Sequence, residues 1–165
     1  MQIEQIGIAT LIPFAKNSRT HNDAQVAQIA ASIKEFGFTN PVLVDEANGI
    51  IAGHGRVLAA RKLNLEQVPS IRLAHLSESQ KRAYVIADNK LALNAGWDDE
   101  MLAVELTDLK DIGFDLDLTG FTLDEFQAIL PIENYPESSA KEIDPDDYKM
   151  SDTCPKCGFE FNAKT

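Results

Sequence analysis

A glycine-flanked turn between a short apolar run and a helix-forming segment constrains the fold of this chain more than any other feature. Residues 50–61 read Ile-Ile-Ala-Gly-His-Gly-Arg-Val-Leu-Ala-Ala-Arg. Gly53 and Gly55 allow the backbone to turn tightly and to approach a ligand closely. A helix that begins near Gly55 directs its unpaired N–H groups and the positive end of its dipole at an anion. The pattern therefore predicts a strand, a turn and a helix that together bind a phosphate.

Two side chains of this turn carry candidate chemistry. Arg56 can clamp a phosphate with two parallel hydrogen bonds. His54 offers a hydrogen-bond donor, or a general acid or base near pH 7. Because a short Gly-x-Gly is common, the spacing alone is equally compatible with an ordinary turn that exposes one arginine.

The segments around the turn predict a small α/β domain with one small sheet. Apolar positions at helical spacing over residues 23–36 predict a core-facing helix, with Asn22 or Asp23 as its cap and Gly37 at its end. Asn48-Gly49 predicts a hairpin turn. The remaining expected elements are strands over residues 3–8, 41–45, 50–52 and 68–73, and a helix over residues 55–63.

The second half of the chain predicts a helical extension. Ser77 and Gln80 form a capping box that opens a helix reaching Ala95. Asp98 and the capping box of Thr122 and Glu125 open two further helices, which we expect to pack rather than to catalyse. The predicted organisation is a nucleotide-binding domain over residues 1–96, a helical extension over 97–131, an acidic linker over 132–150 and a cysteine tail over 151–165.

The charge of the chain is unevenly placed. Residues 1–97 carry ten Lys or Arg and eight Asp or Glu, whereas residues 98–165 carry five and eighteen. A nucleic-acid backbone repels such an acidic half, so charge does not predict strong autonomous DNA binding. With 165 residues, 44% of them apolar, the chain can bury a core without disulfides. No apolar run is long enough to cross a bilayer and no basic leader precedes one, so we expect a cytoplasmic protein without membrane contact.

Cys154-Pro-Lys-Cys157-Gly has the local pattern of a zinc knuckle. A closed structural zinc site takes four ligands, and these two are the only cysteines of the chain. The pair is compatible with a zinc ion shared between two chains in a homodimer, with help from a distant histidine, with ligands from a partner, or with a knuckle that binds no metal.

Four stretches in their order resemble the amino-terminal domain shared by ParB partition proteins and sulfiredoxin, and this resemblance implies an α/β fold in which helices pack on a small mixed sheet. They are residues 8–13 followed by 17–19, residues 32–44, residues 51–56 with 59–60, and residues 68–71. The Gly53–Arg56 turn corresponds to the Gly-Glu-Arg-Arg that holds the triphosphate of CTP in partition proteins. It also corresponds to the Gly-Cys-His-Arg of sulfiredoxin, but the absence of cysteine here argues against sulfiredoxin chemistry. With residues 77–80 and 87–93, the chain looks most like ParB-like proteins of phages and prophages, many of which are associated with DNA methyltransferases.

This resemblance implies a binding site for a nucleoside triphosphate, CTP or ATP, with Mg²⁺. Asp88 and Asn89 stand where partition proteins have a Glu-Asn pair that contacts phosphate and metal, and Asp88 is expected to hold Mg²⁺. Lys90 either extends along the surface or points at the ligand. The implied site residues are Arg19, Gly53, His54, Gly55, Arg56, Asp88, Asn89 and Lys90.

Three functions remain open at this point. The first is a nucleotide-binding protein acting in a phage-type DNA transaction such as modification, partition or packaging, on DNA directly or through a partner. The second is an enzyme of the same superfamily, either a nuclease, which needs clustered carboxylates around a metal, or a small-molecule kinase, which needs a catalytic carboxylate. The third is a non-enzymatic adaptor whose acidic half recruits a DNA methyltransferase or another positively charged protein.

Overall fold

The computed structural model describes residues 1–15, 17, 19–130, 152–153 and 160–161. No helix in these residues is both long and apolar enough to span a membrane. In chain order, the elements are β1 (Ile3–Gly7), η1 (Ile8–Thr10), α1 (Asp23–Phe36), β2 (Val42–Val44), β3 (Ile50–Ala52), α2 (His54–Lys62), β4 (Gln67–Arg72), α3 (Glu78–Ala92), α4 (Asp99–Asp111), η2 (Leu116–Thr119), α5 (Leu123–Ile129), β5 (Asp152–Thr153) and β6 (Glu160–Phe161).

The first four strands form one mixed sheet in the order β1-β4-β2-β3. β1 is antiparallel to β4, β2 is parallel to β4, and β3 is antiparallel to β2. Parallel neighbours need a long connection, and the segment containing β3 and α2 supplies it between β2 and β4. The small mixed sheet predicted from the sequence is therefore confirmed.

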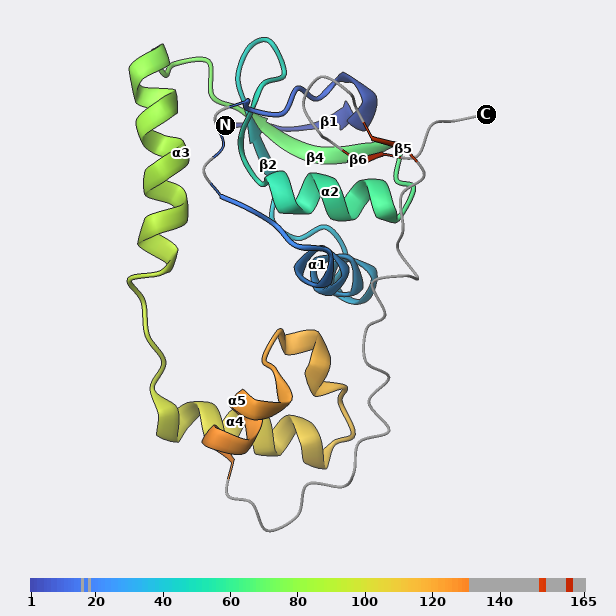
Figure 1. Ribbon diagram of the computed structural model, residues 1–165, viewed down its shortest axis with the longest axis vertical. Coiled ribbons are helices and arrows are strands. Elements are labelled where there is room, and N and C mark those ends of the chain that lie inside the picture. The colour runs from blue at the N-terminus through green and yellow to red at the C-terminus, as the bar shows by residue number, and fades with distance from the viewer. Residues whose placement is uncertain (16, 18, 131–151, 154–159, 162–165) are drawn as a thin grey trace.

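Two helices are stacked on this sheet in layers. α2 lies against the strands, and α1 lies on the outer side of α2 (Figure 1). Small buried residues, Ala30 of α1 and Ala59 of α2, let the two helices approach closely. We call residues 1–73 the sheet domain. Its main core consists of Ile6, Ile8, Leu11, Val42, Val44, Ile50, Val57, Ala60 and Val68.

Local signals fix the ends of these elements as the sequence predicted. The Asn22 side chain accepts a hydrogen bond from the Gln25 N–H at 2.7 Å and caps α1. α1 ends at Gly37, whose φ of 78° lies in the left-handed region. In the β2–β3 turn, Asn48 also has a positive φ. The Asp45 carboxylate closes that turn by accepting the N–H of Gly49 at 2.7 Å.

α3 stands beside the sheet, and most of its surface is exposed (Figure 1). Its predicted capping box is present, but the helix ends at Ala92, before the predicted end. Among its residues, all of which the structure describes, only Val85 is buried, in a cluster with Ile51 and Leu73. Ile86 is 62% exposed, because α3 touches the sheet along a narrower line than a core helix does.

α4, η2 and α5 form a separate small core. Residues 98–130, here called the helical unit, bury Leu106, Leu116, Phe126 and Leu130 together. The predicted caps are present: Asp98 accepts from the Met101 N–H, and Thr122 forms a capping box with Glu125. The unit lies beyond α1 (Figure 1), and the Phe114 and Phe36 rings stack at 6.1 Å. This confirms the helical extension, whereas the predicted cysteine tail lies largely outside the described residues.

Candidate functional site

The glycine turn joins β3 to α2 in the way its sequence predicted. Gly53 has a φ of 98°, which a residue with a side chain rarely adopts. It is the N-cap of α2 and provides no side-chain cap, so the first turn of the helix keeps N–H groups for another acceptor. A Cβ on Gly53 would lie 2.9 Å from Nη2 of Arg56. The arginine therefore lies directly over the bare backbone of the turn.

Arg56 has an unused hydrogen-bond donor. Its Nη2 donates to the Pro41 carbonyl at 3.2 Å. Its Nε is buried and has no hydrogen-bond partner in the described part of the chain. Burial lowers the pKa of Arg56, and the charge of Asp88 acts in the opposite direction. A buried guanidinium with a free donor is costly unless an acceptor reaches it, which makes this group suited to an anionic ligand.

Most of the implied site residues line one cavity of about 160 Å³. Arg19 comes from the loop before α1, and Asp88 and Asn89 come from α3. The remaining lining residues are Asn17, His21, Ile29, Ala52, Gly53, His54, Gly55 and Arg56. Lys90 is exposed and is not among them.

His54 is a neutral, structural histidine at neutral pH. Its Nε2 accepts the backbone N–H of Phe14 at 3.3 Å. Burial, followed by the nearby His21, lowers the pKa of His54 to about 4. The expectation of a general acid or base near pH 7 was therefore wrong. The sequence could not reveal this because Phe14 is forty residues away along the chain.

His21 contributes more than the sequence indicated. Its Nδ1 lies 3.0 Å from Oε1 of Gln25, which orients the ring on α1. A Cβ on Gly55 would lie 3.0 Å from the His21 ring and from Cδ1 of Ile29. Gly55 is thus required for the close contact between α2, α1 and the preceding loop. The Gly-x-Gly pattern contained this signal, but it did not identify the neighbour.

The α3 residues face the turn with different polar groups. Asp88 is exposed and interacts electrostatically with Arg56 across the cavity. The Asn89 Nδ2 donates to the Val85 carbonyl at 2.7 Å, which leaves its Oδ1 as the outward-facing acceptor. Burial, followed by the charge of Asp88, raises the pKa of Tyr84. One carboxylate and one amide oxygen are thus available near the turn as oxygen ligands.

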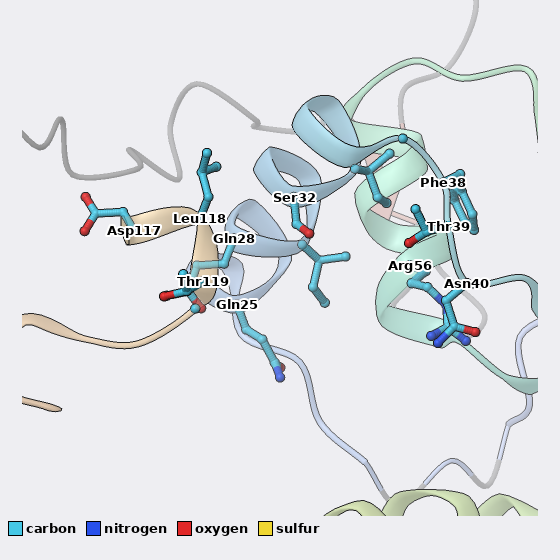
Figure 2. Close-up of a pocket in the computed structure, with 14 residues that line it drawn as sticks. Gln25, Gln28, Ser32, Phe38, Thr39, Asn40, Arg56, Asp117, Leu118 and Thr119 are labelled. Atoms are coloured by element: carbon cyan, nitrogen blue, oxygen red, sulfur yellow. The ribbon is translucent and has the colours of Figure 1, made fainter. Parts of the chain in front are cut away.

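A second cavity of about 350 Å³ adjoins Arg56 on its other side. Figure 2 shows Arg56 and Asn40 at one end of it and Asp117, Leu118 and Thr119 of η2 at the other. Polar side chains of α1 and the following loop line the space between them, namely Gln25, Gln28, Ser32 and Thr39. No motif in the sequence indicated this cavity, because its walls come from α1 and η2, about ninety residues apart.

The proposed zinc ligands cannot be placed. Cys154 and Cys157 lie outside the described residues. Among the described residues, no three His, Cys, Asp or Glu side chains gather as a metal site would require. The zinc knuckle stays a prediction from the sequence.

Residues 1–90 match the ParB N-terminal domain family, which is more than half of the chain. The chain belongs to this family. In Escherichia coli (strain K12), the ParB-like nuclease domain-containing protein YnaK is 57% identical over 72 residues, covering 44% of this chain and 83% of YnaK. The nucleoid occlusion protein of Bacillus cereus (strain AH187) is 32% identical over 93 residues, covering 53% of this chain and 32% of that protein. This ParB-family chain thus spans about a third of the latter's length.

Comparison with solved structures supports the same fold. The C-terminally truncated chromosome-partitioning protein ParB from Caulobacter crescentus, complexed with CTP-gamma-S, superimposes with a TM-score of 0.64 at 20% identity. The match covers 78% of this ParB-family chain and 77% of that one. Residues 100–155 match a second family, the ParB-methyltransferase HTH domain. Sequence reasoning predicted helices over the first part of this range but did not identify the similarity to this family, because their apolar spacing and caps are common to many helical layers.

Proposed function

We propose that the chain binds a nucleoside triphosphate, CTP or ATP, with Mg²⁺ at the glycine turn. The buried, unpartnered Nε of Arg56 beside the uncapped start of α2 is the observation that carries this proposal. A phosphate group supplies what both need, since it accepts charge-assisted hydrogen bonds and is attracted by a helix N-terminus. Arg19, which lines the same cavity, adds a second positive charge.

The cavity size suggests which part of the ligand it holds. A volume of about 160 Å³ is below the roughly 300–1,000 Å³ typical of complete small-molecule sites. We therefore assign the phosphates to the small cavity and the sugar or base to the larger cavity, which Arg56 also lines and which has both apolar and polar walls. Either base is compatible with this arrangement, since the larger cavity offers both donors and acceptors.

Mg²⁺ fits beside the phosphates. It is typically bound by one or two carboxylates together with phosphate oxygens and water. Asp88 is the carboxylate that lines the cavity, and Oδ1 of Asn89 is a second oxygen donor. The metal neutralises negative charge there, and Asp88 holds it within reach of the same phosphates that Arg56 contacts.

The biological setting we propose is a DNA transaction of the phage type, such as modification, partition or packaging. The matched families are named for ParB and for ParB-methyltransferases, and one relative is named a nucleoid occlusion protein, which supports this setting. DNA is reached directly or through a partner, for which a DNA methyltransferase is our candidate. The segment boundaries predicted from the sequence, and a zinc ion shared by two cysteine tails in a homodimer, are part of this proposal.

Isothermal titration of CTP and of ATP, each with Mg²⁺, tests the site. We expect Arg56→Ala to reduce the nucleotide affinity by about 10- to 100-fold, because the variant loses a charge-assisted hydrogen bond to the ligand. Arg82→Ala is the matched control, because this exposed arginine of α3 lies outside both cavities. It should leave the affinity unchanged.

Asp88→Asn distinguishes the contribution of the metal to nucleotide binding from that of the phosphate contacts. It should reduce the gain in affinity that Mg²⁺ provides and leave metal-free binding intact or improved, because a negative charge near the phosphates is removed. Absence of binding by either nucleotide at millimolar concentration would refute the proposal. Equal loss of affinity in Arg56→Ala and Arg82→Ala would refute the assignment of the site.

A further inference from the structure

α4 presents apolar side chains on two opposite faces. One face, with Leu102, Leu106 and Leu109, packs into the core of the helical unit. The other carries Met101 and Val104, which are 60% and 53% exposed. Since Met101 and Val104 are three residues apart, they lie side by side on the helix surface. Both side chains are therefore largely in contact with solvent.

Two further large apolar side chains are exposed next to the ends of α4. Ile112, directly after the helix, is 78% exposed, and Trp97, just before its cap, is 69% exposed. The Trp97 ring rests against Phe121 of the helical unit, with 5.5 Å between ring centroids. Its position relative to the unit is therefore fixed. We call Trp97, Met101, Val104 and Ile112 the outer apolar row.

Acidic side chains lie beside and between the members of this row. Glu105 and Asp108 project from the same side of α4 as Met101, because they are four and seven residues further along the helix. Residues 98–130 contain ten Asp or Glu and one basic residue, Lys110, for a net charge of −9. An exposed apolar row within an acidic rim is typical of a surface that another protein covers.

The charge decides which class of macromolecule fits. A helix-turn-helix gains most of its DNA affinity from cations that contact phosphates. Here the net charge of −9 would repel DNA, although residues 100–155 match a helix-turn-helix family. A second copy of the unit would bring the same negative charge to the interface, and like charges in contact disfavour association.

We propose that the outer apolar row is a docking surface for a protein whose contact face has an apolar centre and a basic rim. Apolar burial supplies the affinity, and the acidic rim selects a cationic partner over an anionic one. The helical unit thus recruits a partner protein instead of reading DNA. This proposal is independent of nucleotide binding at the glycine turn.

Trp97 is the only tryptophan of the chain and reports directly on this surface. Full-length protein is titrated with an amphipathic helical peptide of leucine and lysine, with a lysine peptide of equal charge, and with duplex DNA. We expect the leucine–lysine peptide to shift Trp97 emission to the blue in a saturable manner. The lysine peptide should bind at least about tenfold more weakly, because it cannot bury the apolar row.

Three double variants locate the contact. The variant Met101→Ser with Val104→Ser should bind the leucine–lysine peptide about tenfold more weakly. The same loss of affinity is expected for Glu105→Lys with Asp108→Lys. Glu35→Lys with Glu46→Lys makes the same charge change at exposed positions of the sheet domain and should have little effect. Circular dichroism confirms that each variant is folded, and since all six positions are exposed we expect them to remain so.

Several outcomes would overturn the proposal. A matching blue shift with duplex DNA would restore the DNA-reading function. Equal binding of the two peptides, or equal weakening by the control pair, would reduce the effect to non-specific charge. Absence of any shift in Trp97 emission would show that the row does not bind a basic apolar partner. Self-association of the protein in sedimentation experiments would show that a second copy covers this surface.

Discussion

The sheet domain and the helical unit bury their apolar side chains on different scales. In the sheet domain, the core residues come from seven elements, namely four strands, η1 and the two stacked helices. The helical unit relies on one cluster, centred on Phe126, which is completely buried. One domain therefore distributes its stability over many contacts, whereas the other depends on a single aromatic side chain.

The two regions also differ in charge. The sheet domain carries seven Lys or Arg and six Asp or Glu, whereas the helical unit carries one and ten. Several cations of the sheet domain are held internally: Arg72 contacts Glu4 at 3.1 Å, and Lys62 is buried near Asp23. Among the basic residues, Arg56 combines burial with an unsatisfied donor in the described part of the chain. A ligand-binding role for the first region and a partner-binding role for the second fit this difference.

The largest expected effect tests whether the two cores are independent. Phe126→Ala should destabilise the helical unit by about 3–5 kcal/mol, the usual cost of removing a buried phenylalanine. Amide hydrogen exchange measured by mass spectrometry should rise over residues 98–130 and stay low in the sheet domain. Ile50→Ala, at about 2–5 kcal/mol, should give the reverse pattern. A common rise in both regions after either change would contradict the comparison.

Gly55→Ala tests how tightly the sheet domain is layered. The new Cβ would meet His21 and Ile29 at 3.0 Å, and such overpacking typically costs about 1–3 kcal/mol. The urea midpoint should fall, and so should nucleotide affinity, because the loop that lines the cavity must move. Gly7→Ala is the control, since its nearest neighbour would be Thr10 at 3.9 Å. Equal midpoints for the two variants would show that the helix contact tolerates a methyl group.

Acidification should destabilise the sheet domain through His54. The pKa of His54 is about 4 in the folded chain and about 6.5 when unfolded. The contribution of neutral His54 to the free energy of unfolding is therefore complete above pH 6.5 and is lost as the pH falls toward 4. Between pH 6.5 and 5 this loss amounts to about 2 kcal/mol. In the helical unit the shifts oppose one another. Burial and the charge of Asp115 raise the pKa of Asp117, whereas hydrogen bonds from Thr122 lower the pKa of Glu125, so protonation stabilises at one site and destabilises at the other.

Urea unfolding at pH 6.5 and at pH 5 measures the effect of His54 on stability. Amide hydrogen exchange at the same two pH values shows whether the loss of stability lies in the sheet domain. His54→Gln keeps an acceptor for the Phe14 N–H and cannot be protonated, so its sheet domain should lose much less stability over this range. The same acid-dependent loss in wild type and variant would assign the effect to another group.

The smallest effect compares the helix caps of the two regions. Asn22→Ala in the sheet domain and Thr122→Ala in the helical unit should each cost about 1 kcal/mol, since each removes an acceptor for a helix N–H. Thr107→Ala removes a hydroxyl that donates to the Ala103 carbonyl within α4 and should be nearly neutral. Thermal unfolding measures all three. A neutral Thr122→Ala would mean that tertiary contacts alone hold α5 in place.

Much of the fold could be predicted from short stretches of sequence. The bounds of α1 were identified from an asparagine cap and a terminal glycine. Motif resemblance predicted the mixed sheet, and seven of the eight implied site residues line one cavity. These features depend on backbone preferences of one to four residues, so local sequence is sufficient to specify them.

Errors arose where a side chain meets a distant neighbour. Lys90 lies outside the cavity although Asn89 lines it, because adjacent helix positions point about 100° apart. Met101 and Val104 fit the apolar pattern of α4 as well as Leu102 and Leu106 do, yet only the second pair packs inward. Helical periodicity identifies apolar positions but does not decide which of two apolar faces meets a partner within the chain.

The sequence by itself determined the caps, the glycine turn, the family and the division of charge between the two halves. Only the tertiary structure decided that His54 is a neutral hydrogen-bond acceptor, that Arg56 has a free buried donor between two cavities, and that one apolar face of α4 is exposed. The physical reason is that caps and turns are short-range preferences of the backbone, whereas burial and pKa depend on groups that folding brings together from distant parts of the chain.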